Sequence, residues 1–255
     1  MTTRRKVTCA VLAVGLIAFG IWAANRISGL SEDTQATNPL FRWEYLFTRE
    51  RTPEELWQNT REHLELTVWS VLIGIVLSAV LSALVLRFRW LRAAIFTFAG
   101  VLYTIPSIAL FAILSTYNSN FTAAIIALTS YTLLILTRNF VAGIDAVPQA
   151  ALDAADGLGM SRVQRLVKVE IPLAMPVILT GIRVATVTVV GLVGISAVIQ
   201  LGGLATYIFD GYNRNYPTLM VLGTVATIIL AVALDLVIRG VEWVATPWAH
   251  RRVAR

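Results

Sequence analysis

The sequence predicts an all-α integral membrane protein, a polytopic bundle of about six transmembrane helices. Of its 255 residues, 57% are hydrophobic and only 14% are charged, whereas an average soluble domain has roughly 45–50% and about 25%. The apolar residues gather into runs close to the ~20 residues that a helix needs to cross a bilayer. The single cysteine cannot form an internal disulfide. An ordinary soluble enzyme, a disordered chain and a disulfide scaffold are therefore excluded.

Each apolar run is expected to be a helix, because in lipid the backbone must satisfy its own hydrogen bonds. Pro106 and Pro176 are expected to bend the third and fifth runs, since a proline inside a helix removes a backbone hydrogen bond. The fourth run is short, so we expect it to rely on neighbouring helices. The predicted spans are residues 7–24, 64–86, 93–115, 121–137, 173–199 and 217–238.

The first run has two interpretations. A basic start followed by an apolar core that ends in Ala23 and Ala24 also fits a cleaved signal peptide. The apolar stretch is longer than the ~7–15 residues of a signal core, which favours a retained helix. Either interpretation leaves the orientation of the later spans unchanged.

The distribution of basic residues predicts that both termini are cytoplasmic. With that orientation most Lys and Arg residues outside the spans lie on the inner side, as the positive-inside rule requires. The acidic residues from Glu32 to Glu65 gather in or beside the first outer loop. Anionic lipid headgroups explain such a basic rim, so we expect a membrane partner and no nucleic acid.

The chain is expected to have one membrane domain with two flanking parts. Residues 1–63 would form an N-terminal anchor helix and an extracytoplasmic loop, residues 64–238 the transmembrane domain, and residues 239–255 a basic cytoplasmic tail. The longest inner loop, residues 138–172, separates the first four spans from the last two.

Local signals predict a helix-turn-helix in this inner loop. Pro148 suits a first helical turn, where its missing N–H is not needed. Gly159 suits the position after a helix end, where φ is positive. Ser161 and Gln164 have the spacing of a capping box that starts a second helix. The Ile-Pro pair at 171–172 is expected to end that helix before the next span.

The first helix of the loop carries a stripe of small residues. Ala151, Ala155 and Gly159 recur every four residues, with Asp153 and Asp156 beside them. A stripe of nearly bare backbone allows another surface to approach closely. This helix is therefore either an amphipathic connector that rests on lipid or on the chain's own helices, or a docking element for a cytoplasmic partner.

The loop resembles the "EAA" loop of permease subunits of bacterial ABC importers. The matching residues are Asp153-Ala154-Ala155, then Gly159, then Ile171-Pro172. Asp153 stands where Glu is usual, which keeps the charge but shortens its reach. The resemblance implies a coupling helix that sits in a groove of a separate ATPase subunit. The coupling residues that it implies are Ala151, Asp153, Ala154, Ala155, Gly159, Ile171 and Pro172.

Other segments resemble the osmoprotectant branch, which imports glycine betaine, carnitine, choline or related zwitterions. They are His63-Leu64, Thr104 to Ser107, Arg138-Asn139 with Gly143, Gly181 to Arg183, and Phe209 to Asn215. Two departures are Tyr103, where Gln is expected, and the segment 200–205. Either leaves open another importer branch, for methionine or a different amine.

The resemblance implies alternating access in a bacterial plasma membrane. Two permease subunits, identical or homologous, would form the path, two cytoplasmic ATPases would drive it, and an extracytoplasmic binding protein would deliver the solute. The chain has no GxxxxGK[ST] loop, so ATP hydrolysis is expected in the partner and this chain is expected to have no catalytic residue. No His/Cys cluster has the spacing of a metal site, so neither metal nor cofactor is expected.

Arg183 and Asp235 are charges within predicted spans. An isolated charge at a helix centre costs roughly 2.5–3.5 kcal/mol on insertion scales, so each is expected to find a partner or water. Both are hypothesised to face the bundle interior, as structural charges or as part of the solute path. The alternative is that Arg183 reaches the headgroups and that Asp235 pairs with Arg239 four residues on.

Small and aromatic residues have simpler interpretations. Gly74, Ser78 and Ser82 repeat every four residues and predict close helix packing. Several tyrosines could form a cation–π cage, but most lie near span ends, where aromatic belts are expected. A membrane-embedded enzyme would need polar residues at one depth, and the two histidines, His63 and His250, fall on opposite sides. A passive scaffold would show no dependence on ATP.

Overall fold

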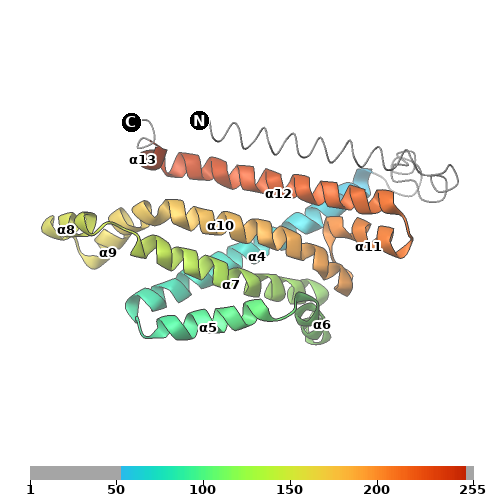
Figure 1. Ribbon diagram of the computed structural model, residues 1–255, viewed down its shortest axis with the longest axis horizontal. Coiled ribbons are helices and arrows are strands. Elements are labelled where there is room, and N and C mark those ends of the chain that lie inside the picture. Colours follow the sequence, from blue (N-terminus) through green and yellow to red (C-terminus); the bar gives the residue numbers. More distant parts are fainter. Residues whose placement is uncertain (1–52, 251–255) are drawn as a thin grey trace, which may run out of the picture.

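The computed structural model describes residues 53–250, and its regular elements in this range are all helices, with no strand among these residues (Figure 1). The predicted first span, residues 7–24, lies outside the described residues. The long helices are α4 (Pro53–Arg87), α5 (Leu91–Thr104), α6 (Ser107–Tyr117), α7 (Asn120–Asp145), α10 (Ile171–Val193) and α12 (Pro217–Ala245). The short elements are α8 (Gln149–Gly157), α9 (Arg162–Arg165), the π-helix η1 (Leu166–Glu170), the 3-10 helices η2 (Gly194–Ile199) and η3 (Gly203–Ala205), α11 (Thr206–Asn213) and α13 (Pro247–His250).

Four helical stretches of the described chain are long and apolar enough to cross a membrane. They are residues 54–87, 120–145, 162–199 and 217–245, and each contains one predicted span. The all-α, multi-pass membrane class predicted from the sequence is therefore confirmed.

Two helices stand where the sequence predicts one bent span over residues 93–115. The axes of α5 and α6 meet at 91° on either side of Pro106. Ile105 is extended, with φ −62° and ψ 130°, because a residue that precedes proline avoids the helical region. The Tyr131 hydroxyl donates a hydrogen bond to the Ile105 carbonyl at the break. The predicted bend at Pro106 is thus present, and it is a right angle.

Helix α7 is the centre of the bundle. It packs against α4, α10, α5 and α6, and most of its apolar residues are buried. The small-residue face of α4 lies against it: a Cβ on Gly74 would overlap the Thr132 hydroxyl, and the Ser82 hydroxyl lies 3.5 Å from the Thr137 carbonyl. Both predictions, close packing by this face and the dependence of the short fourth run on its neighbours, are confirmed.

The prediction that the second loop helix ends at Ile171 and Pro172 is wrong. The chain remains helical from α9 through η1 into α10, and the Ile171 N–H donates to the Leu166 carbonyl across a π-helical turn. Pro172 lies in the first turn of α10, directly after the π-helical turn. Pro176 lies inside α10, which continues past it.

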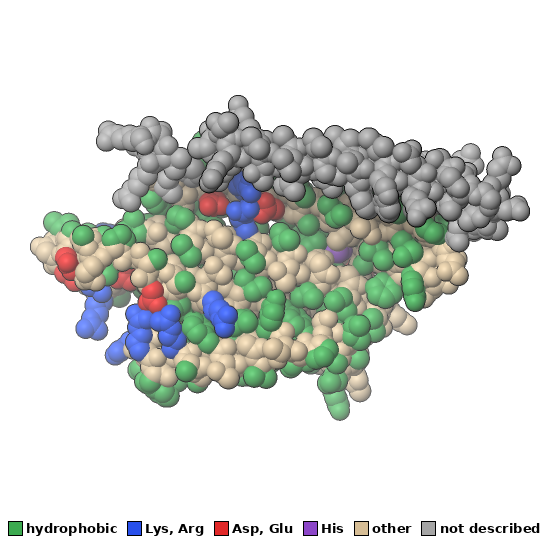
Figure 2. Space-filling model, in the orientation of Figure 1, with side chains coloured by type: hydrophobic (Ala, Val, Ile, Leu, Met, Phe, Trp, Pro, Cys, Tyr) green, Lys and Arg blue, Asp and Glu red, His purple; other side chains and the backbone are tan. Residues whose placement is uncertain are grey.

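On the face of the molecule drawn in Figure 2, the visible charged side chains lie mainly toward one end. Figure 2 shows most of the visible Lys, Arg, Asp and Glu side chains over the end that carries α8 and α9, and mainly apolar and neutral groups over the other end. Asp145, the last residue of α7, accepts hydrogen bonds from Arg89 at 2.9 Å and Arg92 at 3.1 Å. The turn between α4 and α5 is thereby fastened to the end of α7.

Candidate functional site

The loop between α7 and α10 contains two helices joined by a tight turn. Helix α8 ends with Leu158 as its C-cap, and Gly159 follows with φ 72°. The Gly159 N–H donates to the Asp156 backbone carbonyl at 2.9 Å, and the Met160 N–H donates to the Ala155 backbone carbonyl at 3.2 Å. These two bonds are the Schellman pattern. A Cβ at Gly159 would meet nothing within 4 Å, so the positive φ alone requires glycine there.

The second loop helix begins at the predicted capping box. The Gln164 N–H donates to the Ser161 hydroxyl at 3.3 Å, and the Ser161 N–H donates to the Gln164 side chain at 2.9 Å. Pro148 occupies the N-cap of α8, one position before the first turn that the sequence suggests. The C-terminal cap of α8 at Leu158 and the capping box of α9 at Ser161 fix the two ends of the turn between these helices.

Arg165 fastens the two parts of the loop together. Its guanidinium contacts the Asp156 carboxylate on α8 at 2.7 Å and the Glu170 carboxylate on η1 at 2.9 Å. Sequence reasoning missed this bridge, because Asp156 and Arg165 are nine residues apart across a turn and share no helical face. The charges themselves were the only signal in the sequence.

The expected coupling residues divide between an outer and an inner face of α8. Ala155 is 3% exposed and Ala151 is half-buried, so these two residues of the stripe face the chain's own helices, whereas Gly159 is exposed. Asp153 and Ala154 are exposed, and Leu158 is 76% exposed. Ile171 and Pro172 are half-buried at the base of the loop. The surface that α8 presents outward is therefore acidic and apolar.

A cavity of about 760 Å³ lies between the bundle and this loop. Its floor is apolar and comes from α4, α7 and α10, with Phe140 and Ile178 among its residues, and its charged residues include Asp145, Arg165 and Glu170. Gln149 and Leu152 of α8 also line it. The loop thus closes one side of an interior space.

Arg183 and Asp235, the charges predicted inside spans, contact each other between α10 and α12. The Arg183 guanidinium donates to both Asp235 carboxylate oxygens, at 2.8 and 3.1 Å, and lies 3.6 Å from Glu242. Arg239 lies 3.7 Å from Asp235, so the alternative i,i+4 pair is present as well. The two side chains are 22% and 26% exposed, which fits a structural pair, and the sequence had not indicated that they are partners.

Two segments far apart in the sequence meet at the opposite end of the molecule. The Glu62 carboxylate accepts hydrogen bonds from the N–H groups of Gly202 at 3.0 Å and Gly203 at 3.2 Å. Gly203 has φ 49°, and a Cβ there would lie 2.6 Å from the His63 Cβ. The unusual segment 200–205 therefore packs against the start of α4, where His63 is fully buried.

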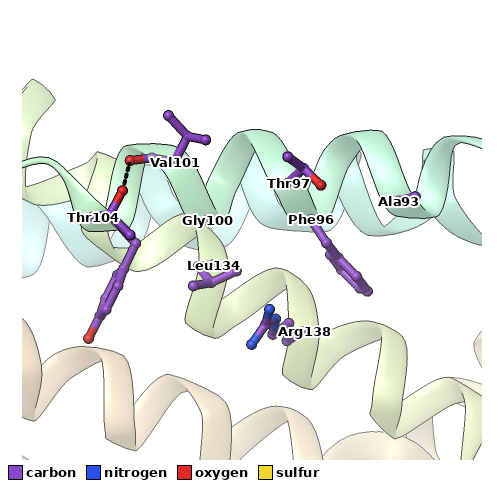
Figure 3. Close-up of a pocket in the computed structure, with 9 residues that line it drawn as sticks. Ala93, Phe96, Thr97, Gly100, Val101, Thr104, Leu134 and Arg138 are labelled. Atoms are coloured by element: carbon purple, nitrogen blue, oxygen red, sulfur yellow. Dashed lines mark hydrogen bonds between the residues drawn. The ribbon is translucent and has the colours of Figure 1, made fainter.

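A groove of about 580 Å³ runs between α5 and α7 (Figure 3). Arg138 of α7 lies over the Phe96 ring of α5, at 5.9 Å from its centroid, and Tyr103 also lines the groove. Tyr117 is 83% exposed and Tyr207 is buried in another cluster, so the tyrosines do not form one cage. Tyr103 and Tyr131, however, contact each other edge to face at 6.0 Å.

Comparison with known proteins identifies the family. The model of the "Binding-protein-dependent transport system inner membrane component" family matches residues 70–242. An osmoprotectant import permease protein of Salmonella typhimurium is 35% identical over 74% of this chain and 90% of its own. A glycine betaine/carnitine/choline transport system permease protein of Bacillus subtilis is 34% identical over 76% of this chain and 89% of its own.

Solved structures share the fold. A chain of the MetNI methionine ABC transporter, in an inward-facing conformation, aligns with a TM-score of 0.67 and 20% identity over 78% of this chain and 100% of that one. A chain of a bacterial alginate ABC transporter aligns with a TM-score of 0.59 and 17% identity over 97% and 95%. From the extent of the family match and the identity to these permeases, the chain belongs to the inner membrane components of binding-protein-dependent transport systems.

Proposed function

We propose that this chain is the permease subunit of an ATP-driven importer for osmoprotectants of the quaternary amine class, such as glycine betaine, carnitine or choline. The observation that carries the proposal is identity of 34–35% to permeases named for these solutes, over about three quarters of the chain. The methionine transporter shares the fold at 20% identity, which says nothing about the solute.

The exposed face of α8 is the proposed contact with the ATPase. Asp153 and Ala154 are exposed beside Leu158, and the Arg165 bridge and the Gly159 turn hold this face in place. The Asp153 carboxylate accepts a hydrogen bond from the Gln149 amide at 2.8 Å and keeps lone pairs for a cationic partner. The inward-facing coupling residues are proposed to hold this exposed face in position against the rest of the chain. They are Ala151, Ala155, Ile171 and Pro172.

The proposed arrangement places the α8–α9 end in the cytoplasm, because basic residues favour the inner side. Those at this end are Arg87, Arg89, Arg92, Arg162, Arg165 and Lys168. Residues 64–238 form the transmembrane domain, with residues 1–63 and 239–255 as flanking parts and both termini cytoplasmic, in the plasma membrane of a bacterium. A second permease subunit, identical or homologous, completes the path. An ABC importer permease implies separate ATPase and solute-binding proteins, and ATP hydrolysis is assigned to the ATPase.

Capture of the ATPase tests this proposal. The tagged chain is purified in mild detergent from its own membranes, beside Gly159→Val and the control Gly191→Val in α10, away from the loop. A Cβ meets nothing within 4 Å at either position, and of the two only Gly159 has a positive φ. We expect the native chain and the control to retain an ATPase and Gly159→Val to lose it, with uptake of betaine, carnitine or choline falling in parallel. Normal capture and uptake by Gly159→Val would contradict the assignment of α8.

A further inference from the structure

The groove between α5 and α7 combines a cation and an aromatic ring in one open space. One face of α5 lines it with Phe96, Gly100 and Thr104, and α7 contributes Leu134 and Arg138. A Cβ on Gly100 would meet nothing within 4 Å, so the groove is open at its middle. Its volume of about 580 Å³ lies within the ~300–1,000 Å³ of small-molecule sites.

Arg138 is held in this groove by an aromatic contact. Its guanidinium lies 5.9 Å from the Phe96 centroid, and the Arg92 guanidinium lies 5.7 Å from the same ring. Among residues 53–250 no carboxylate forms an ion pair with Arg138, whereas Arg92 pairs with Asp145. Figure 3 shows the Phe96 ring and the Arg138 side chain together in the space between the two helices. The guanidinium N–H groups of Arg138 are therefore available to an anion, and a carboxylate can accept two of them.

Tyr103 lies farther along the same groove. It follows Phe96 by seven residues on α5, which corresponds to about 10 Å along the helix axis. Its ring meets the Tyr131 ring edge to face, with 71° between the planes, and the Tyr131 hydroxyl is bound to the Ile105 carbonyl. Tyr103 is 41% exposed, so part of its ring remains available to a quaternary ammonium, which aromatic faces attract.

We propose that this groove is a transit site for the carboxylated, zwitterionic solutes, in which Arg138 binds the carboxylate and the Tyr103 ring contacts the quaternary ammonium. The inference rests on the proposed function. It uses Tyr103, the position at which the chain departs from the osmoprotectant pattern. Phe96 is a positioning residue, because it acts through Arg138. An anionic lipid headgroup would occupy the arginine alone and leave the Tyr103 ring unused.

The test compares solutes that have and lack the carboxylate. The full importer, with its ATPase and binding protein, is placed in vesicles, and uptake of glycine betaine, carnitine and choline is measured for the native chain. Arg138→Gln, Arg138→Lys, Tyr103→Leu and Tyr103→Phe follow. Arg87→Gln is the matched control, because the Arg87 guanidinium also lies over a ring, that of Phe88 at 5.2 Å, outside the groove.

We expect Arg138→Gln to lower betaine and carnitine uptake by about tenfold or more and choline uptake by less than about twofold. Arg138→Lys should recover part of the lost uptake. Tyr103→Leu should lower uptake of all three solutes, whereas Tyr103→Phe and Arg87→Gln should remain near the native level. The amount of complex in the vesicles should be the same for every variant.

Two kinds of outcome would overturn the inference and separate it from the proposed function. If Arg138→Gln lowered choline uptake as much as betaine uptake, Arg138 would be assigned to folding. If that equal loss varied with the anionic lipid content of the vesicles, Arg138 would be assigned to lipid contact. A native chain that imports choline but no carboxylated solute would also overturn the transit-site inference. In both cases the proposal that the chain is an importer permease is unaffected. A native chain that imports none of the three would remove the proposed solute class and this inference together.

Discussion

Two hydrogen bonds join Arg183 of α10 to Asp235 in the second half of α12, a half in which no residue is fully buried. The buried residues of α12 are Thr218, Leu219 and Gly223, all in its first two turns. The rest of the helix lies against α10 through partly exposed side chains. The ion pair therefore fixes the second half of α12 to the bundle.

Replacing Arg183 should loosen this half of the protein. Among residues 53–250, Arg183→Leu leaves Asp235 with the more distant Arg239 and removes the ion-pair partner of Glu242, and an unpaired, partly buried charge costs about 1–3 kcal/mol. We expect a lower thermal midpoint in detergent. The double variant Arg183→Leu/Asp235→Leu should be more stable than Arg183→Leu alone, and a double variant that is the less stable of the two would contradict the pairing. Normal uptake by a folded Arg183→Leu would exclude a role in the solute path.

The Arg165 bridge should control the mobility of α8. Arg165→Met removes the contacts to Asp156 and Glu170, so the amides of α8 should exchange with solvent several-fold faster than in the native chain. Hydrogen exchange by mass spectrometry measures this. Arg162→Met, in the same helix, is the control and should exchange at the native rate. Equal rates in both variants would mean that the bridge does not hold α8.

The contact between α4 and α7 should not tolerate a side chain at Gly74. A Cβ there would overlap the Thr132 hydroxyl, and overpacking of this kind costs about 1–3 kcal/mol. Gly74→Ala should lower the thermal midpoint, whereas Gly191→Ala, where a Cβ meets nothing within 4 Å, should maintain or raise it. Gly74→Ala/Thr132→Ala should recover part of the loss, since it removes the overlapping oxygen.

The segment at the other end should depend on Gly203. Its φ of 49° is unfavourable for other residues, and a Cβ would lie 2.7 Å from the Asn59 carbonyl oxygen as well as against His63. Gly203→Ala should cost about 1–3 kcal/mol and lower the yield of folded protein. Glu62→Gln, which keeps one acceptor oxygen for the Gly202 and Gly203 N–H groups, should be milder. Native stability of Gly203→Ala would show that this segment can move away from α4.

Cysteine labelling checks the orientation of the chain. In a Cys9→Ser background, a cysteine at Ser119, the exposed N-cap of α7, should react with an impermeant reagent added to intact cells. A cysteine at Ser161, the N-cap of α9, should react only after the cells are opened. The reverse pattern would place the α8–α9 end outside the cell.

The features that the sequence predicted correctly depend on nearby residues. The apolar runs locate the spans because each residue contributes its own free energy of transfer into lipid. Gly159 and the pair of Ser161 and Gln164 were recognisable because a cap and a turn are completed within four residues. The small-residue face at Gly74 was visible from its spacing alone.

The features that it missed join distant residues. The break at Pro106 includes a contact from another helix, because the Tyr131 hydroxyl donates a hydrogen bond to the Ile105 carbonyl. The partners Arg183 and Asp235 are 52 residues apart, and the Arg165 bridge crosses a turn. The direction of the Ala155 stripe also depends on which side of α8 the chain itself covers. None of these has a periodic signal along one element.

The unbroken helix from α9 through η1 into α10 has a mechanical consequence. From Arg162 to Val193 the chain stays helical through a π-helical turn and past Pro176, a length of about 45 Å at ~1.5 Å per residue. If this length moves as one body, a tilt of about 5° about its loop end displaces its far end by about 4 Å. A small change in the tilt of α9 would then displace the start of η2, which follows the far end of α10.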